Sequence, residues 1–213
     1  AAIAGSKISP TFTTDGSFNS VSIGKGANSV AGNTVLGEGA LDASVSGGSN
    51  TAIGKDALTA LTSGANNTAI GKDSLKAVTT GGTNVGIGVD ALTTLSTGSN
   101  NTAVGTGAME NTTTASNNTS LGQNALHANT TGHSLVAIGA TALTANTTGT
   151  SNVAIGRQCL DANTSGGSNV AVGRGSLGSN TTADNNTAVG TDSLAANTTG
   201  ANNTVAGSFA ADA

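Results

Sequence analysis

The five residues Asn67-Thr68-Ala69-Ile70-Gly71 are the unit from which most of this chain is built. Near-copies return every 17 residues, and the glycine that ends the unit recurs without a gap from Gly37 to Gly207. A strict short period is typical of a solenoid, in which each repeat forms one coil and stacks on its neighbours. Residues 17 apart can therefore be compared as columns, where a column is the set of equivalent positions in successive coils.

Composition alone would favour disorder. The 213 residues include three Phe, no Trp, no Tyr and 32 Gly. Few large side chains are available to offset the conformational entropy lost on folding. The period reverses that expectation, because stacked identical residues gain regular backbone pairing in place of side-chain bulk.

Charge and hydropathy exclude several classes of partner. The formal net charge is −4, and the seven Lys and Arg residues form no cluster that could neutralise phosphates. No run approaches the roughly 20 apolar residues of a membrane-spanning helix, and the first residues lack the pattern of a signal peptide. We therefore expect neither nucleic-acid binding nor membrane insertion. The single cysteine, Cys159, excludes an intrachain disulfide.

The sequence divides into two parts. Residues 1–18 contain the only proline, Pro10, together with Phe12 and Phe18, and we interpret them as a lead-in or cap that covers the first coil. Residues 19–213 form the solenoid, beginning with a short repeat that brings Gly24 to Gly37 in 13 residues. Phe209 is the expected plug at the far end.

Two strands are expected in each coil. In the coil that begins at Asn67 the first strand is Thr68–Ile70, and the second centres on Leu75-Lys76-Ala77, because apolar residues alternate there with period two. Turns are expected at Gly71-Lys72-Asp73 and Thr80-Gly81-Gly82. An aliphatic column is expected to form the core together with the leucines. It includes Ile53, Ile70 and Ile87.

Two further columns have a predicted structural role. The glycine column, which includes Gly54, Gly71 and Gly88, is expected at a sharp corner that needs positive φ or close backbone approach. The asparagine column is expected to form a hydrogen-bonded ladder, with amides stacked about 4.8 Å apart. It includes Asn50, Asn67, Asn84 and Asn101, and only Leu135 interrupts it.

About eleven coils at about 4.8 Å each predict a thin rod on the order of 50 Å long. The alanine column, for example Ala52 and Ala69, is small enough for another wall to approach closely. We expect that wall to belong to a second copy of the chain, so that three rods surround one axis as a homotrimer.

The stretch Asn19-Ser20-Val21-Ser22-Ile23-Gly24-Lys25-Gly26-Ala27 and the later Asn-Thr-Ala-Ile-Gly units resemble the head repeats of YadA-type trimeric autotransporter adhesins. That resemblance covers residues 19–207 and implies a left-handed parallel β-roll, three chains to a head, and binding to host surface molecules. Turns such as Asn146-Thr147-Thr148-Gly149 also resemble repeats of bacteriophage tail-fibre proteins, and Gly5–Pro10 resembles segments of phage fibres. The 17-residue coils and the lack of a heptad stalk, membrane anchor or signal peptide favour a phage fibre or an excised fragment over a complete autotransporter.

No catalytic, cofactor-binding or metal-binding residue is expected. His127, His133 and Cys159 each fall in a column of ordinary small or polar residues, without the partners that a metal or a nucleophile needs. Surface binding, if present, is expected at the charged turns. Asp56, Asp73 and Asp90 stack on consecutive coils and either hold a cation or form a solvated turn beside Lys55 and Lys72. Arg157 and Arg174 either meet anionic sugars or are solvated.

These features favour a structural attachment fibre or adhesin on a virion surface, one that mediates or spaces contact with host glycans or proteins. A virion or cell-surface protein would hold its N-terminus. Two alternatives stay open: the head of a bacterial trimeric autotransporter at the cell surface, and a Thr-rich ice-binding solenoid. An enzyme is not expected, because no carboxylates or bases cluster as a glycoside-cleaving groove requires.

Overall fold

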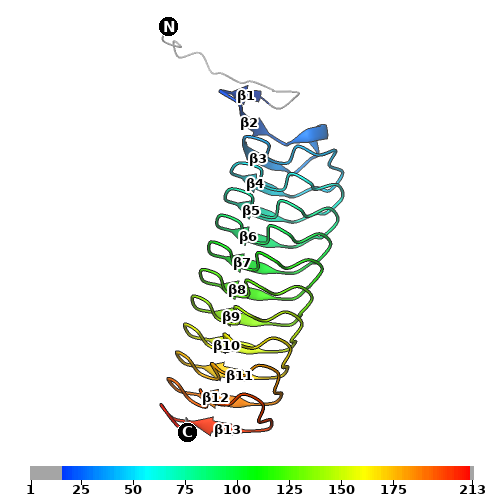
Figure 1. Cartoon of the computed structure of the whole chain (residues 1–213). Coiled ribbons are helices and arrows are strands. Elements are labelled where there is room, and N and C mark those ends of the chain that lie inside the picture. The colour runs from blue at the N-terminus through cyan, green and yellow to red at the C-terminus, as the bar shows by residue number, and fades with distance from the viewer. Residues whose placement is uncertain (1–15, 212–213) are drawn as a thin grey trace.

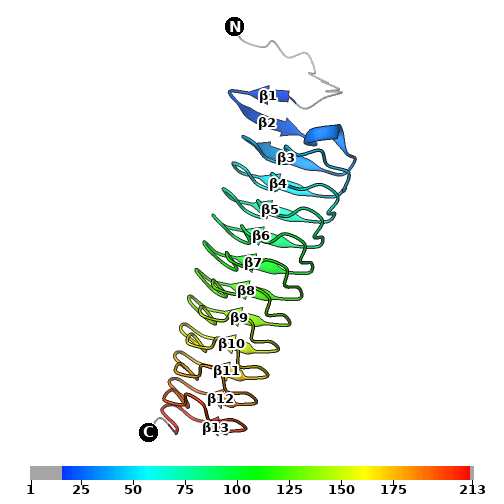
Figure 2. The same ribbon diagram turned by 45° about the vertical axis from the view of Figure 1, so that its right-hand side comes forward.

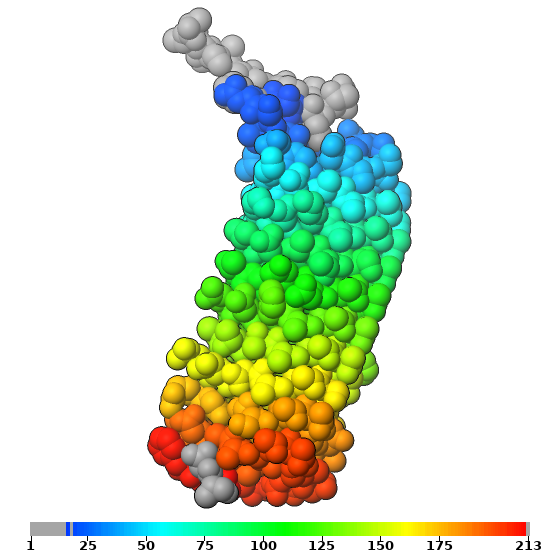
Figure 3. Space-filling view, viewed as in Figure 1, coloured from blue at the N-terminus to red at the C-terminus, as the bar shows by residue number. Residues whose placement is uncertain are grey.

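The computed structural model describes residues 16–211 and shows an all-β solenoid with about 17 residues per coil. Figures 1 and 3 show the coils stacked one on another along an elongated rod. The strands are β1 (Gly16–Phe18), β2 (Val21–Gly24), β3 (Thr34–Gly37), β4 (Thr51–Ile53), β5 (Thr68–Ile70), β6 (Val85–Ile87), β7 (Thr102–Val104), β8 (Thr119–Leu121), β9 (Val136–Ile138), β10 (Val153–Ile155), β11 (Val170–Val172), β12 (Thr187–Val189) and β13 (Thr204–Ala206). A 3-10 turn, η1, spans Ala27–Ser29.

All strands belong to one sheet, in sequence order. From β3 to β13 neighbours are parallel and offset by one repeat, so that Ala52 pairs with Ala69 and Ile53 with Ile70. β1 and β2 run antiparallel to their neighbours, with Ile23 opposite Leu36 (Figure 2). The short repeat is thus an antiparallel segment over the first parallel coil and not a coil of the same kind.

The expected cap lies mostly beyond the described residues. Pro10 and Phe12 fall outside them, as does the side chain of Phe18. At the other end Phe209 is 63% exposed, so the expectation that it plugs the last coil is wrong. Within residues 16–211 no helix is long and apolar enough to cross a membrane.

Each coil has one strand, and the expected second strand at Leu75–Ala77 is wrong. Asp73 and Leu75 both have left-handed backbone conformations, with φ of 57° and 50°. The segment still bonds to the next coil, because the N–H of Leu75 donates to the Ala91 carbonyl at 3.0 Å. Apolar residues alternate here because the chain makes two left-handed bends, which direct Leu75 inward. Each such bend costs about 1–2 kcal/mol of conformational free energy when the residue is not glycine.

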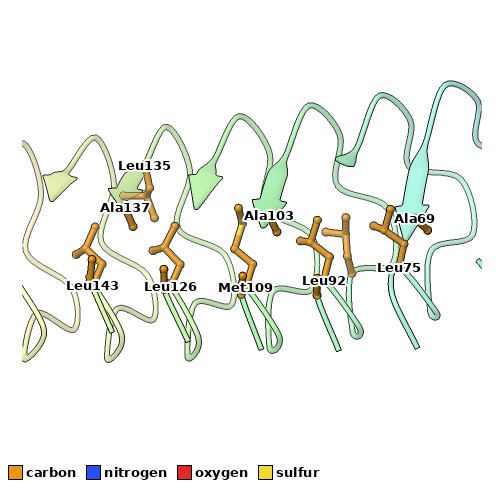
Figure 4. Packing of buried hydrophobic residues seen from close by; sticks show 14 of the residues in the cluster. Ala69, Leu75, Leu92, Ala103, Met109, Leu126, Leu135, Ala137 and Leu143 are labelled. Atoms are coloured by element: carbon orange, nitrogen blue, oxygen red, sulfur yellow. The ribbon is translucent and has the colours of Figure 1, made fainter. Parts of the chain in front are cut away.

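The core lies between the inner face of the strands and the leucine column. Ala69 is fully buried, whereas Ile70 in the same strand is 36% exposed. A Cβ added to Gly86, which occupies the alanine column, would lie 3.2 Å from Cγ of Leu75. Figure 4 shows Ala69, Ala103 and Ala137 on the side of the strand that faces the leucines.

The predicted roles of the alanine and isoleucine columns are therefore reversed. Alanine points into most coils, where the wall opposite leaves room for a small side chain, although the first parallel coil accepts Val35; Ile53, Ile70 and Ile87 point outward. Because successive side chains of a strand point to opposite faces, the residues before and after an inward alanine point outward.

The glycine column forms the corner, as predicted. Gly54 has φ of 123°, and a Cβ there would lie 2.6 Å from the Gly71 carbonyl oxygen of the next coil. Gly71 and Gly88 have φ of 137° and 135°. Only glycine satisfies both the backbone conformation and the close approach.

The asparagine column forms the predicted ladder. Asn67 donates to Oδ1 of Asn50 from its backbone N–H at 2.9 Å and from Nδ2 at 3.2 Å, and Asn84 repeats this on Asn67. Asn101 continues the ladder with Nδ2 donating to Asn84 at 3.1 Å.

A second asparagine ladder was not predicted. The Nδ2 of Asn146 donates to Oδ1 of Asn129 at 2.9 Å, and Asn163, Asn180 and Asn197 continue the column. In earlier coils the same column holds buried aliphatic residues: Leu61, Val78 and Leu95. The interior thus changes from aliphatic to amide about halfway along the rod.

Candidate functional site

The outer face is the solvent-facing side of the parallel sheet, made by the first and third residues of each strand from β3 to β13. In β5 these are Thr68 and Ile70, on either side of buried Ala69. No other layer of the described residues covers this face, although a sheet in a globular domain usually buries its apolar side.

One column of the outer face is aliphatic along almost the whole rod. The in-register pairing of the parallel strands places these side chains about 4.8 Å apart. Isolated exposed aliphatic residues are ordinary, but a contiguous row indicates an interaction surface. The column is Leu36, Ile53, Ile70, Ile87, Val104, Leu121, Ile138, Ile155, Val172 and Val189, and its most exposed members reach 44% at Leu36 and 48% at Leu121.

The charged turn after β5 is an ion-pair cluster. Nζ of Lys76 lies 2.7 Å from Oδ1 of Asp73, and Lys72 contacts the other carboxylate oxygen. These hydrogen bonds, from Lys72 first and then from Lys76, hold the pKa of Asp73 below its ordinary value. In the preceding coil Lys55 pairs with Glu38 at 3.0 Å.

The aspartate column has a conformational explanation. Asp56, Asp73 and Asp90 all have left-handed φ between 56° and 59°, which Asp tolerates better than most residues. Within residues 16–211 no group of three or more His, Cys, Asp or Glu residues is placed to hold a metal ion. The left-handed φ accounts for aspartate in this column, and Asp73 itself is buried between Lys72 and Lys76 and is not solvated as expected.

The two arginines do not form one site. Arg174 pairs with Asp192 across one coil, while Arg157 is exposed on the preceding coil. An ion pair at Arg174 competes with any anionic sugar, so the structure gives no support to a shared anion site.

His127, His133 and Cys159 have local partners. Nδ1 of His127 lies 3.5 Å from Oε2 of Glu110, and Nδ1 of His133 lies 3.3 Å from Oγ of Ser134. The thiol of Cys159 donates to the Ala171 carbonyl at 3.1 Å, and burial raises its pKa to about 12. Such a thiol is a poor nucleophile.

The Thr-rich corner of each coil, for example Thr79-Thr80 before Gly81, forms hydrogen bonds to the same corner of the next coil. The hydroxyl of Thr62 donates to the Thr79 carbonyl at 3.0 Å, and Thr147 does the same to Thr164 at 3.0 Å. The same coil-to-coil bond is made by Thr79, Ser96, Thr113, Thr130, Thr164 and Thr181. These hydroxyl protons hold the stack together, while the second hydroxyl residue of each pair, such as Thr80 and Thr148, is exposed.

Two hollows lie towards the ends of the stack. One, of about 300 Å³, is lined by residues that include Gly26 and Leu41, and the other, of about 440 Å³, by residues that include Leu194 and Asn203. Among their lining residues only Asp42 is ionisable, so neither assembles an acid–base pair.

The outer face is thus the strongest candidate site, and the sequence interpretation placed its side chains in the core. The signal that was missed is the alanine between two larger residues in each strand, as in Thr68-Ala69-Ile70. A 17-residue coil is too narrow to accept isoleucine from one wall and leucine from the other. Comparison of the chain with protein-family models, with curated proteins and with solved structures finds no match.

Proposed function

We propose that this chain is the self-associating rod of an attachment fibre, in which copies pack through the outer face and the corners remain free to space or contact a host surface. The aliphatic column of the outer face carries this proposal. Water contacts it along the whole described rod, although Ile and Val side chains gain free energy when they are buried.

The stabilisation available from this column is substantial. Complete burial of an Ile or Val side chain contributes about 1.5–3 kcal/mol, and a side chain that is about one-third exposed has roughly one-third of that still to gain. A column of this length therefore offers each copy on the order of 5–10 kcal/mol. That exceeds the low end of the estimated entropic cost of association, about 4 kcal/mol.

A homotrimer uses this face most simply. Three narrow, flat faces can all point at one threefold axis, and closed cyclic symmetry then leaves no outer face uncovered. The charged turns and the Thr-rich corners remain outside. A virion or cell-surface protein would hold the N-terminal end, and host glycans or proteins would be met by the exposed corners. The head of a bacterial autotransporter would use the same assembly at a cell surface.

The self-association is tested by light scattering coupled to gel filtration. The chain of 20.0 kDa should elute with about three times that mass. Replacing Ile70 and Ile87 together with Lys should give the monomer, while the matched control Thr80→Lys, on an exposed corner, should not. A monomeric mass for the unmodified chain at about 100 µM would refute the proposal.

The attachment role needs a separate experiment. Antibodies raised against the purified rod should label projections on the source particle or cell, and their Fab fragments should reduce its adsorption to host cells. Labelling that is confined to the interior of the particle would contradict an attachment fibre.

Ice binding is the second candidate, because the outer face also carries a partial row of threonines. Thr51 and Thr68 point outward on neighbouring coils, as do Thr102 and Thr119. Val85 interrupts this row. At the Thr-rich corner, hydroxyl groups donate their protons to carbonyl groups of the next coil. The outward threonine row therefore matches ordered water less well than it matches another chain. Thermal hysteresis above that of a control protein would favour this candidate.

A further inference from the structure

The interior of the rod contains unpaired polar groups near its middle. Oγ1 of Thr112, in the coil of β7, and Oγ of Ser120, in β8, are buried without a hydrogen-bond partner among the described residues. Within residues 16–211 one other buried side-chain oxygen shares this condition, Oγ of Ser193 in the coil of β12. A buried hydroxyl without a partner loses the hydrogen bonds that it makes to water in the unfolded chain.

The first asparagine ladder also breaks in this region. Its side-chain oxygens accept the backbone N–H of the next coil, as Oδ1 of Asn152 does from Asn169 at 2.9 Å. Leu135 has no side-chain oxygen, so the N–H of the buried Asn152 lacks the acceptor that its counterparts use. Together with the two hydroxyls, three buried polar groups are left without their partners within residues 112–152, which we call the joint.

The interior is packed in two different ways on either side of Thr112. In the same column, the preceding coils hold the fully buried Leu61, Val78 and Leu95, whereas the coils from Asn129 onward hold the second asparagine ladder. Thr112 supplies neither the aliphatic volume of leucine nor the amide that would continue the ladder. The joint is therefore where one type of interior gives way to the other.

Ion pairs also lie mainly outside the joint. Those of the charged turn precede it, and the pair of Arg174 with Asp192 follows it. The sequence from 111 to 156 contains no Asp, Glu, Lys or Arg. His127 lies 3.5 Å from Glu110, a contact that is an ion pair only when the histidine is protonated. Backbone pairing continues in register from β7 to β10, so the weakness lies in the side chains.

Cooperativity in a solenoid depends on such contacts, because each coil touches only the coils before and after it. The stability of the stack is roughly the sum of the stabilities of its coils and of the interfaces between them. Where the interfaces are weak, the folding of one side depends little on the other. The two sides can then open as separate units.

We propose that the joint divides the rod into two blocks that unfold independently. The first block is residues 34–111, with β3 to β7, and the second block is residues 153–206, with β10 to β13. Heat or mechanical load that opens one block then leaves the other folded. This inference concerns a single chain, goes beyond the proposed function and does not rest on it.

Hydrogen–deuterium exchange, measured on proteolytic peptides of the native chain, tests the independence of the blocks. Gly71→Ala perturbs the first block and Gly173→Ala the second. The two glycines occupy the same column, with φ of 137° and 135°, and an added Cβ would clash with the carbonyl oxygen of Gly88 or Gly190. Each variant should lose at least tenfold in protection within its own block, while the other block changes less than twofold. Complete unfolding of the substituted block keeps the test decisive, because the other block gives the answer.

The role of the joint is tested by repeating both substitutions in a repaired background that carries Thr112→Val, Ser120→Ala and Leu135→Asn. Each replacement is a residue that the same column holds in other coils. In this background the loss should spread, so that Gly71→Ala lowers protection at least threefold in the second block as well. Ser193→Ala is the matched control: it removes a buried unpartnered hydroxyl outside the joint and should leave the loss confined.

Two results would contradict this account. Loss of protection in both blocks of the parent chain after either glycine substitution would show one cooperative unit and overturn the proposal. Loss that stays confined to one block in the repaired background would overturn the role assigned to the unpaired groups of the joint.

Discussion

Replacing Asn67 with leucine should destabilise the rod more than the same replacement at Asn169. Both residues are fully buried members of the first asparagine ladder. Asn169 donates to Oδ1 of Asn152 from N–H at 2.9 Å and from Nδ2 at 3.2 Å, the same two distances that join Asn67 to Asn50. Leucine branches at Cγ as asparagine does, and Leu135 shows that the column accepts it.

The two sites differ in one carbonyl group and in one amide hydrogen, because Nδ2 of Asn84 donates to Asn67 at 3.0 Å whereas Asn186 reaches Asn169 through its backbone N–H. Nδ2 of Asn67 donates to the Gly81 carbonyl at 2.9 Å, and the neighbouring column holds Val78, which cannot donate. Nδ2 of Asn169 donates to the Ala183 carbonyl at 2.8 Å, but Asn180 of the second ladder also donates to it at 3.1 Å. The Gly149 carbonyl beside Leu135 is likewise supplied by Asn146, at 3.1 Å. The second ladder therefore compensates for a missing first-ladder amide.

The size of the difference follows from counting unpaired groups. Asn67→Leu removes the acceptor of the Asn84 N–H, the acceptor of one Asn84 Nδ2 hydrogen, and the only donor that reaches the Gly81 carbonyl within residues 16–211. Asn169→Leu removes only the acceptor of the Asn186 N–H. A buried group without a partner costs about 1–3 kcal/mol, and the gain from the added leucine is similar at both sites. Because Asn67→Leu leaves two more groups unpaired than Asn169→Leu, the expected gap of about 2–6 kcal/mol corresponds to roughly 4–24 °C in Tm.

Thermal and urea unfolding, followed by circular dichroism at one protein concentration, measure this gap. Adding Asn180→Val to Asn169→Leu should remove the compensation and lower the stability towards that of Asn67→Leu. Equal losses for the two single variants, or a larger loss at Asn169, would refute the compensation argument.

Three further outcomes are expected. Gly54→Ala should cost several kcal/mol, because φ is 123° and the new Cβ would lie 2.6 Å from the Gly71 carbonyl oxygen, whereas Gly167→Ala, without positive φ and with its closest contact at 3.1 Å, should lower the urea midpoint less. Cys159, whose thiol pKa burial raises to about 12, should not react with a thiol-specific reagent at pH 8 until denaturant is added; rapid labelling of the folded chain would contradict its burial. Because Lys72 and Lys76 lower the pKa of Asp73, the stability from this cluster is present above the ordinary value of 3.8 and is lost as pH falls below it. Asp73→Asn, which keeps a residue suited to left-handed φ, should make Tm less dependent on pH below about 4, and an unchanged acid profile would count against the ion pairs.

The sequence determined those features that depend on one residue type at one spacing. The 17-residue period, the corner at Gly54 and its column, the ladder through Asn67 and the strand Thr68–Ile70 all follow from backbone contacts between a residue and its copy one coil away. Such contacts need no knowledge of the rest of the coil.

Only the tertiary structure decided which side of the strand is inside. Alternation in Thr68-Ala69-Ile70 is equally compatible with either face, and hydrophobicity alone favoured Ile70 for the core. The width of the coil reverses this, because Leu75 reaches the strand from the opposite wall and leaves space for alanine. Leu75 can do so only through a left-handed turn that its period-two neighbours do not reveal. The outer face, and with it the candidate site, exists because a narrow coil excludes its larger aliphatic column from its own interior.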